Sequence, residues 1–327
     1  MRFVLRRLGF FMVTLWAAVT INFLIPRLIP GNPALAMLAR YRGRVNPQAL
    51  HALEIDFGVG VAHQSFISSY FGYLANTFTG HLGISLTFFP EPVSKAVLQA
   101  LPWTLGLVGT TTVLAFLLGT LIGLIGGWRR GGVLDSVLPP VFIVISAFPY
   151  FWIGLVAILV FGVILKWLPL GSGYSVTDTI GWSWQFVGDV LVHSILPAAT
   201  ILITAIGGWI LTMRNNMVTV LAEDYVRMAR AKGLRPWTIM WTYAGRNAIL
   251  PNLVGFAMSL GFVVSGAILV EYVFNYPGVG WMLLQSVLND DYALMQALFL
   301  LITFAVLVAI LVADVLTAIL DPRVRES

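Results

Sequence analysis

The sequence predicts an all-α membrane protein whose helices cross the bilayer several times. Hydrophobic residues make up 59% of the 327 residues, whereas charged residues make up only 10%. The mean hydropathy is +0.90. Soluble domains carry about 25% charged residues, so a chain of this composition does not have the polar surface of a soluble protein.

Six apolar segments are long enough to cross a bilayer, which takes about 20 helical residues. They lie near Leu8–Ile29, Leu101–Trp128, Val137–Leu165, Ile195–Met213, Asn252–Phe274 and Leu294–Ile319. The third is long enough to tilt or bend, and Pro149 in its middle removes a backbone hydrogen bond from a helix. The first follows Arg2, Arg6 and Arg7 like a signal peptide, but its apolar run exceeds the usual length of about 7–15 residues. We therefore expect six membrane spans.

The distribution of Lys and Arg predicts that both termini face the cytoplasm. In that orientation 13 of the 19 basic residues lie on the cytoplasmic side, as the positive-inside rule requires. Three segments then face outside, at 30–100, 166–193 and 275–292. The chain accordingly divides into residues 1–29 with the first span, the external segment 30–100, and a core that occupies 101–327.

Two short helices are expected in the external segment. Residues Gln48–Ile55 follow a turn, and Ser65–Thr77 carries apolar residues at helical spacing. The apolar face of the second helix, which includes Phe66 and Tyr70, suits a position on the domain or membrane surface. Packing is favoured over contact with a substrate.

Residue types that carry metal or redox chemistry are sparse. There is no Cys, which excludes disulfides, iron–sulfur clusters and cysteine-ligated zinc. The four His residues lack the HxxxH or HExxH spacing of a metal site and fall in the external segments, where we interpret them as solvated loop residues. They are His51, His63, His81 and His193.

The chain also lacks a nucleotide-binding loop of its own. No GxxxxGK[ST] pattern occurs, and none of Lys95, Lys166 and Lys232 follows a Gly. A P-loop for ATP phosphates is therefore excluded. The basic residues are spread over separate loops, so no nucleic-acid footprint is expected.

A polar segment, Ala222–Pro251, interrupts the apolar sequence between the fourth and fifth predicted spans. Glu223 and Asp224 suit the positive N-terminal end of a short helix, and Arg230 and Lys232 suit its negative C-terminal end. An ion pair is expected between Glu223 and Arg227, four residues apart.

The expected helix in this polar segment ends at Gly233, a good residue for the position after a helix. Pro236 suits the first turn of a second short helix. Ala229 and Ala231 leave part of the first helix without bulky side chains, so another protein could approach it closely. The alternative is a solvated basic loop that only sets membrane topology.

Several motifs in this chain together resemble the membrane permeases of ATP-binding-cassette importers, in the peptide/opine/nickel branch. The stretch DYVRMARAKGL followed by RNAILP is similar to the EAAxxxG…LP cytoplasmic signature of that family, with Arg227-Met228-Ala229 in the EAA slot, Gly233 in the Gly slot and a late Leu250-Pro251. Other stretches that are similar to family motifs are MRFVLRRLGF, IPGNP, FPYFWIGLVAILVFGVILKWLPLGSGY, EYVFNYPGVG and DPRVR. The resemblance covers nearly the whole chain.

The resemblance implies a fold, a mechanism and partners. The fold would be that of a type I importer permease, with a coupling loop at 214–251. This chain would pair with a sister permease, two ATPase subunits that hold ATP and Mg²⁺, and an extracytoplasmic solute-binding protein, in the inner membrane of a bacterium or archaeon. It would bind no cofactor itself. The residues implied in coupling to the ATPase are Tyr225, Met228, Ala229, Arg230, Ala231, Lys232 and Gly233.

Cargo and path remain open in the sequence. The resemblance favours di- and oligopeptides, with oligosaccharides, nickel and glutathione as alternatives. Small polar residues in the spans either line the path or let helices pack closely. Those residues are Thr110, Thr111, Thr112, Ser146, Thr200, Thr204, Ser259 and Ser265. Glu271 and Asp314, near the ends of spans, are candidates for a substrate role or for structural hydrogen bonds. A transporter driven by an ion gradient is the rival class, but it would need ionisable residues near the midplane.

Overall fold

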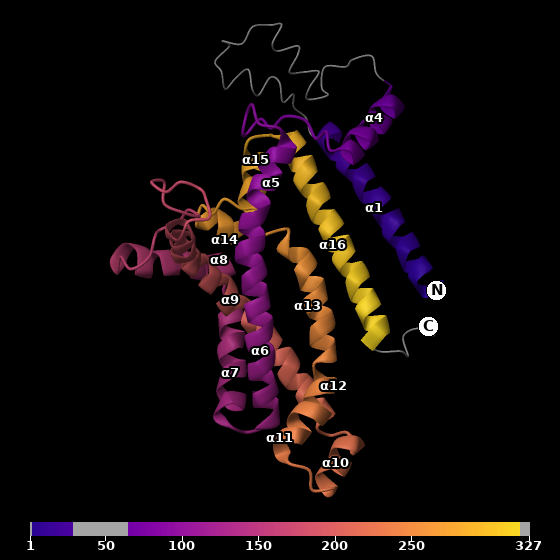
Figure 1. The fold of residues 1–327 in the computed structure, drawn as a ribbon, viewed down its shortest axis with the longest axis vertical. Coiled ribbons are helices and arrows are strands. Elements are labelled where there is room, and N and C mark those ends of the chain that lie inside the picture. The colour runs from indigo at the N-terminus through magenta and orange to yellow at the C-terminus, as the bar shows by residue number, and fades with distance from the viewer. Residues whose placement is uncertain (1, 29–64, 321–327) are drawn as a thin grey trace.

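The protein is an elongated bundle of helices in a computed structural model that describes residues 2–28 and 65–320 (Figure 1). Every regular element within these ranges is a helix. Four helices there are long and apolar enough to cross a membrane, and a bent pair makes a fifth candidate. The prediction of an all-α protein with several spans is confirmed. The expected helix at Gln48–Ile55 lies outside the described residues.

The four long helices contain four of the six predicted spans. Two of them extend well beyond the apolar segments, because polar residues continue the helix where hydropathy no longer marks it. The helix that includes the second predicted span runs unbroken for 36 residues. The elements are α1 (Arg2–Leu28), α5 (Val93–Thr104) continued by a π-helical turn (Leu105–Gly109) into α6 (Thr110–Trp128), α9 (Trp184–Val220) and α16 (Tyr292–Leu320).

The third predicted span is bent, as its central proline indicates. Helix α7 (Val133–Ser146) ends before Pro149, and α8 (Tyr150–Ala157) begins directly after it. A π-helical segment, Ile158–Ile164, continues α8. The two arms meet at 90°, and Figure 1 shows α8 turned across the bundle. The proline ends the first arm because it lacks the N–H that the helix needs.

The fifth predicted span, Asn252–Phe274, is wrong as a single helix. Helix α13 (Leu250–Val263) has 14 residues, which extend about 21 Å, short of the roughly 30 Å of a bilayer core. The chain breaks at Gly266, whose φ of 69° lies in the left-handed region that a right-handed helix cannot contain. Two short helices follow, α14 (Ile268–Val273) and α15 (Val279–Leu288).

Helices α6 and α9 pack at the centre of the bundle through glycines. A methyl group on Gly119 would lie 2.6 Å from Trp209 Cβ, and one on Gly123 would lie 2.5 Å from the Ile210 carbonyl oxygen. Gly127, one turn further, is as tightly covered by α9. Membrane helices approach this closely only where small residues line the contact.

An external helix, α4 (Phe66–Thr79), confirms the helix predicted at Ser65–Thr77. Its aromatic residues pack on α1 around Phe23, which is fully buried. The ring centroid of Phe23 lies 5.2 Å from that of Tyr70 and 5.4 Å from that of Tyr73. Tyr70 and Tyr73 of α4 thus pack on α1, whereas Phe66, Ile67 and Phe71 of the same helix are 60%, 67% and 63% exposed.

Helices α1 and α16 are joined near both of their ends. Asn22 Nδ2 donates to the Gln296 carbonyl oxygen at 2.8 Å, and Gln296 Nε2 donates to the Asn22 carbonyl oxygen at 2.9 Å. Towards the termini, Arg7 Nη1 lies 2.9 Å from Asp314 Oδ2. Asp314 thus forms an ion pair that joins two helices. Of the two roles expected for it, substrate contact or structure, this is the structural role. The same pair places the start of α1 beside the end of α16.

Candidate functional site

The polar segment forms a compact group of short helices at one end of the bundle (Figure 1). Its first element, α10 (Asp224–Ala231), begins after the extended residue Glu223 and carries an acid in its first turn and Arg230 in its last. It ends at Gly233, with a φ of 70°. These predicted helix-end features are confirmed. The expected ion pair between Glu223 and Arg227 is wrong. Arg227 pairs with Asp224 instead, and its Nη1 lies 3.6 Å from Asp224 Oδ1.

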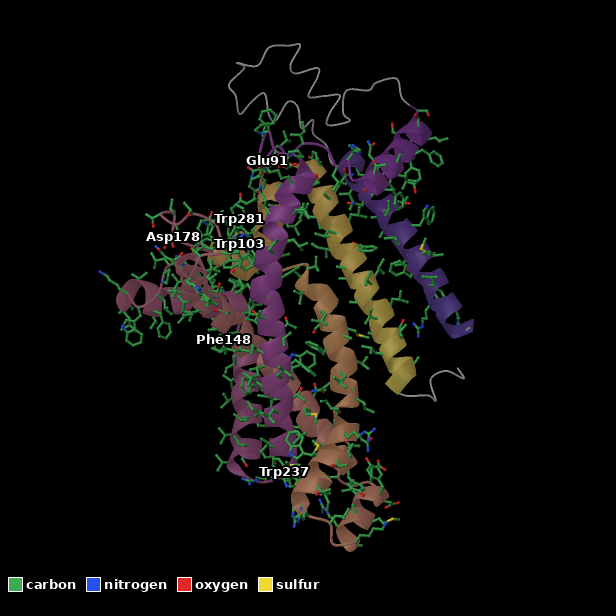
Figure 2. The ribbon with its side chains drawn as sticks, in the orientation of Figure 1. Glu91, Trp103, Phe148, Asp178, Trp237 and Trp281 are labelled. Carbon is green, nitrogen blue, oxygen red and sulfur yellow. The ribbon has the colours of Figure 1, made fainter. Side chains whose placement is uncertain are left out.

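A second run of helix returns the chain to the membrane. It starts with Pro236 in α11 (Pro236–Thr238), as predicted, and continues through a π-helical segment, Ile239–Gly245, into α12 (Arg246–Ala248). Proline suits this start because its missing N–H would have no partner in a first turn. Figure 2 shows Trp237 at the α11 end, far from the outer helices.

Substitution of Gly233 is expected to loosen the end of α10 through the backbone alone. Nothing lies within 4 Å of the place that a Cβ would take at this position, so a side chain meets no clash. The left-handed conformation costs a non-glycine residue about 1–2 kcal/mol, and Asn tolerates it better than Ala. We expect hydrogen exchange of the α10 amides to speed up in the order Gly233, Gly233→Asn, Gly233→Ala. Equal exchange in all three proteins would contradict this account.

The inner face of α10 is buried against the rest of the chain. Val226 is fully covered and Ala229 is 2% exposed, and both pack with Ile239 of the π-helical segment. Trp128 at the end of α6 and Leu221 after α9 complete this contact. We call Val226, Ala229 and Ile239 the α10 joint. The idea that Ala229 leaves room for another protein is wrong, because residues of this chain cover its methyl group.

The outer face of α10 carries the other residues expected to contact an ATPase. Met228 is 58% exposed and Tyr225 is 39% exposed. The guanidinium of Arg230 lies 5.8 Å from the centre of the Trp128 ring, a cation–π contact. The Tyr225 hydroxyl accepts a hydrogen bond from Asn247 Nδ2 at 3.0 Å. The remaining exposed members of the set are Ala231, Lys232 and Gly233. Their role in coupling stays a prediction.

A buried cluster below the α10 joint ties it to the long helices. Met213 and Met217 of α9 are fully buried. They pack with Met240 of the π-helical segment and with Leu124 of α6. Asn216 Nδ2 donates to the Ala248 carbonyl oxygen at 3.1 Å. Sequence reasoning missed these residues, although two methionines four residues apart on a helix were a visible signal. Buried contacts thus connect α10 to α6 and α9 through the π-helical segment Ile239–Gly245.

Most of the small polar residues in the spans turn their hydroxyls back to their own helix. Thr111 donates to the Leu107 carbonyl oxygen at 2.7 Å, and Thr200 donates to that of Leu196 at 2.9 Å. The hydroxyls of Thr110, Thr204, Ser259 and Ser265 do the same. Each of these hydroxyls is thus satisfied by a nearby carbonyl oxygen of its own segment, and Thr204 also lines a pocket with residues 147–150.

The described residues hold no group of three or more His, Asp or Glu side chains that could bind a metal ion. The interpretation of His193 as a solvated loop residue is wrong, because it lies within α9 with its side chain 9% exposed and its Nδ1 3.3 Å from Asp189 Oδ1. The hydroxyl of Thr79 lies 2.9 Å from the His81 ring. His51 and His63 lie outside the described residues.

Comparisons with known proteins agree with this architecture. A permease protein of a di/tripeptide transport system in Pseudomonas aeruginosa is 34% identical, over 99% of this chain and 99% of that protein. Permease proteins of an oligopeptide system in Bacillus subtilis and a dipeptide system in Lactococcus lactis are each 29% identical over the same shares. The profile of the family described as "Binding-protein-dependent transport system inner membrane component" matches residues 119–326. The chain therefore belongs to this family of inner-membrane transport components.

Proposed function

We propose that this chain is a permease subunit of an ATP-binding-cassette importer for di- and oligopeptides. It would pair with a sister permease to form the translocation path and receive cargo from an extracytoplasmic solute-binding protein. Two separate ATPase subunits would hold ATP and Mg²⁺ and drive the cycle. Both termini and the polar segment would lie in the cytoplasm of a bacterium or archaeon. The observation that carries the proposal is the construction of α10.

Helix α10 has the two faces that a mechanical coupling element needs. Its inner face is fixed to the long helices through the α10 joint. Its outer face presents Met228 and Tyr225 beside the cations Arg227, Arg230 and Lys232. Adjacent exposed apolar side chains that are rimmed by polar residues are typical of interaction sites on proteins. A subunit that binds the outer face would therefore move α6 and α9 when it moves α10.

The names of the relatives favour peptides as cargo. The three reported permeases belong to systems named for di/tripeptides, oligopeptides and dipeptides. We expect uptake of a labelled dipeptide by the assembled transporter to fall when unlabelled peptides compete, and to be unaffected by oligosaccharides. Competition by oligosaccharides but not by peptides would show that the cargo is an oligosaccharide.

Acidic substitutions on the outer face of α10 are expected to release the ATPase subunits. Met228→Glu and Lys232→Glu place acids at the proposed contact, and both side chains lie outside the α10 joint. We expect at least a tenfold loss of ATPase that co-purifies with the full complex. Such a loss corresponds to about 1.4 kcal/mol of binding free energy, a modest demand on central contact residues.

Arg129→Glu is the matched control for this experiment. Arg129 is an exposed arginine that follows α6 at the same end of the bundle. Its reversal should leave the co-purified ATPase unchanged. Equal retention in all three variants would reject α10 as the docking element. ATP-independent uptake in cells without any partner ATPase would instead favour the ion-driven class.

A further inference from the structure

Helix α4 presents an exposed apolar surface at the end of the bundle far from α10 (Figure 1). None of its 14 residues is charged, and none is buried. A helix that lies in water carries charged or polar residues on its open face. The open face of α4 therefore has to be examined side by side with the face that contacts α1.

The first side of α4 is fixed to α1 by hydrogen bonds. The Tyr70 hydroxyl lies 2.8 Å from the Thr20 hydroxyl, and the Tyr73 hydroxyl accepts from Asn22 Nδ2 at 3.1 Å. Tyr70 and Tyr73 are three residues apart, so both point to the same side of the helix. These bonds set the rotation of α4 about its own axis, and its other two sides therefore have defined directions.

The second side of α4 is apolar and open. Ile67 and Phe71 are four residues apart, and Phe78 follows after seven more, so the three share one side of the helix. Each of these side chains is more than half exposed. We call Ile67, Phe71 and Phe78 the α4 apolar stripe. Contact of three large apolar side chains with water is unfavourable, so the stripe suits an apolar medium.

The third side of α4 is small and polar. Ser68, Gly72 and Thr79 follow the three residues of the apolar stripe by one position each, which places them about 100° further round the helix. All three are exposed. The helix thus has one side for α1, one for an apolar medium and one for water. A helix that lies in the surface of a bilayer needs the last two of these sides.

The contacts with α1 place α4 at a defined depth. The apolar span of α1 is Arg6–Ile25. Thr20 and Asn22, which bond to α4, lie three to five residues before its end, or about 5–8 Å along the helix axis. Interfacial helices bury their apolar face about 5–10 Å into the boundary between headgroups and acyl chains. The depth of α4 therefore matches that of an interfacial helix.

The surface of α1 next to α4 continues as an exposed apolar stripe. Trp16 and Met12 precede Thr20 by four and eight residues, so they lie on the same side of α1. Both are more than half exposed, and most of this span is not buried by the rest of the chain. An apolar span that is open on one side faces lipid. Helix α4 thus stands at the end of a surface that faces the acyl chains.

We propose that α4 is an interfacial helix, and that the partner of the α4 apolar stripe is the lipid surface at this end of the bundle. The stripe would lie among the headgroups and upper acyl chains, with Ser68, Gly72 and Thr79 turned to water. In the proposed orientation this is the outer leaflet. The placement requires only that α1 crosses the bilayer, so it does not depend on peptide cargo or on contact with an ATPase.

Spin labels at neighbouring positions test this placement, because the chain contains no Cys of its own. Ile67→Cys and Phe71→Cys report on the apolar stripe, and Ser68→Cys and Gly72→Cys are their matched neighbours. A Cβ at Gly72 has nothing within 4 Å, so this label has room. Each variant is studied in the full complex, without cysteines in the partner subunits, in bilayers of phosphatidylethanolamine and phosphatidylglycerol.

The measurement compares collisions of each label with oxygen, which concentrates in lipid, and with a nickel chelate, which stays in water. We expect the labels at 67 and 71 to collide mainly with oxygen at a depth of about 5–10 Å, and those at 68 and 72 mainly with nickel. Equal access of nickel to all four would overturn the proposal. Protection of 67 and 71 from both reagents would also overturn it, because another subunit would then cover the stripe.

An acid within the stripe tests the same placement from a second direction. With the label at Phe78→Cys, Phe71→Glu should raise access of nickel to the label, because a carboxylate resists transfer among acyl chains. Gly72→Glu places the same acid one position later, on the polar side, and should leave access unchanged. An unchanged label in Phe71→Glu, or an equal rise in both variants, would contradict the placement of the stripe in lipid.

Discussion

Gly123→Ala is expected to disrupt the central packing of α6 on α9 and to sharply lower the yield of folded protein. The new methyl group would lie 2.5 Å from the Ile210 carbonyl oxygen and 2.8 Å from Met213 Cβ. Neither the backbone nor a Cβ atom can turn away, so the two helices must separate. Overpacking of this kind costs about 1–3 kcal/mol, and a clash with backbone belongs at the upper end. Unfolding in mixed detergent and SDS measures the loss.

Gly126→Ala gives a matched control on the same helix. Nothing lies within 4 Å of a Cβ at Gly126, so the methyl group has room, and alanine is the better helix former. We expect this variant to unfold at the SDS fraction of the unmutated protein or slightly above it. Equal destabilisation by the two substitutions would show that the helix contact at Gly123 is not the cause.

Ala229→Leu is expected to free α10 from the bundle while the spans stay folded. Ala229 is 2% exposed between Val226 and Ile239, and three added carbon atoms do not fit there. A cost of about 1–3 kcal/mol would fall on one short helix rather than on the whole protein. We expect at least a tenfold loss of ATP-driven uptake, and faster hydrogen exchange confined to α10.

Ala231→Leu is the matched control, because it makes the same substitution on the same helix at an exposed position. Ala231 lies on the same helix but is exposed, so a larger side chain there points away from the α10 joint. Its exchange rates should match those of the unmutated protein. Faster exchange in Ala231→Leu, or unchanged exchange in Ala229→Leu, would contradict the placement of the two faces.

Local chemistry explains why the ends of α10 could be predicted from the sequence. Asp224, Gly233 and Pro236 act through their own backbone or through the helix end beside them, so no distant contact is needed. The burial of Ala229 could not be predicted in this way. It depends on Ile239 and Trp128, which approach only after the chain has folded.

The fifth span was wrongly predicted as one helix for a similar reason, since contacts with distant residues decide its shape. Hydropathy counts Val264 to Phe274 as apolar sequence apart from Ser265 and one acid, Glu271. It does not register that Glu271 finds its donors on α15 and on α5. Gly266, with Pro277 and Gly278 close behind, was the available signal for a corner in place of a continuous helix. The bend at Pro149 was predicted because proline acts on its own helix.

The central claim is that a separate ATPase subunit binds the outer face of α10. Cysteine cross-linking at Met228 tests this claim most directly. The chain has no Cys, so Met228→Cys is a single reporter on the exposed face. In the full complex with a short bifunctional reagent, we predict a cross-link from residue 228 to an ATPase subunit. Arg129→Cys, at the same end of the bundle, should give none. A cross-link from residue 129 with none from 228 would contradict the claim.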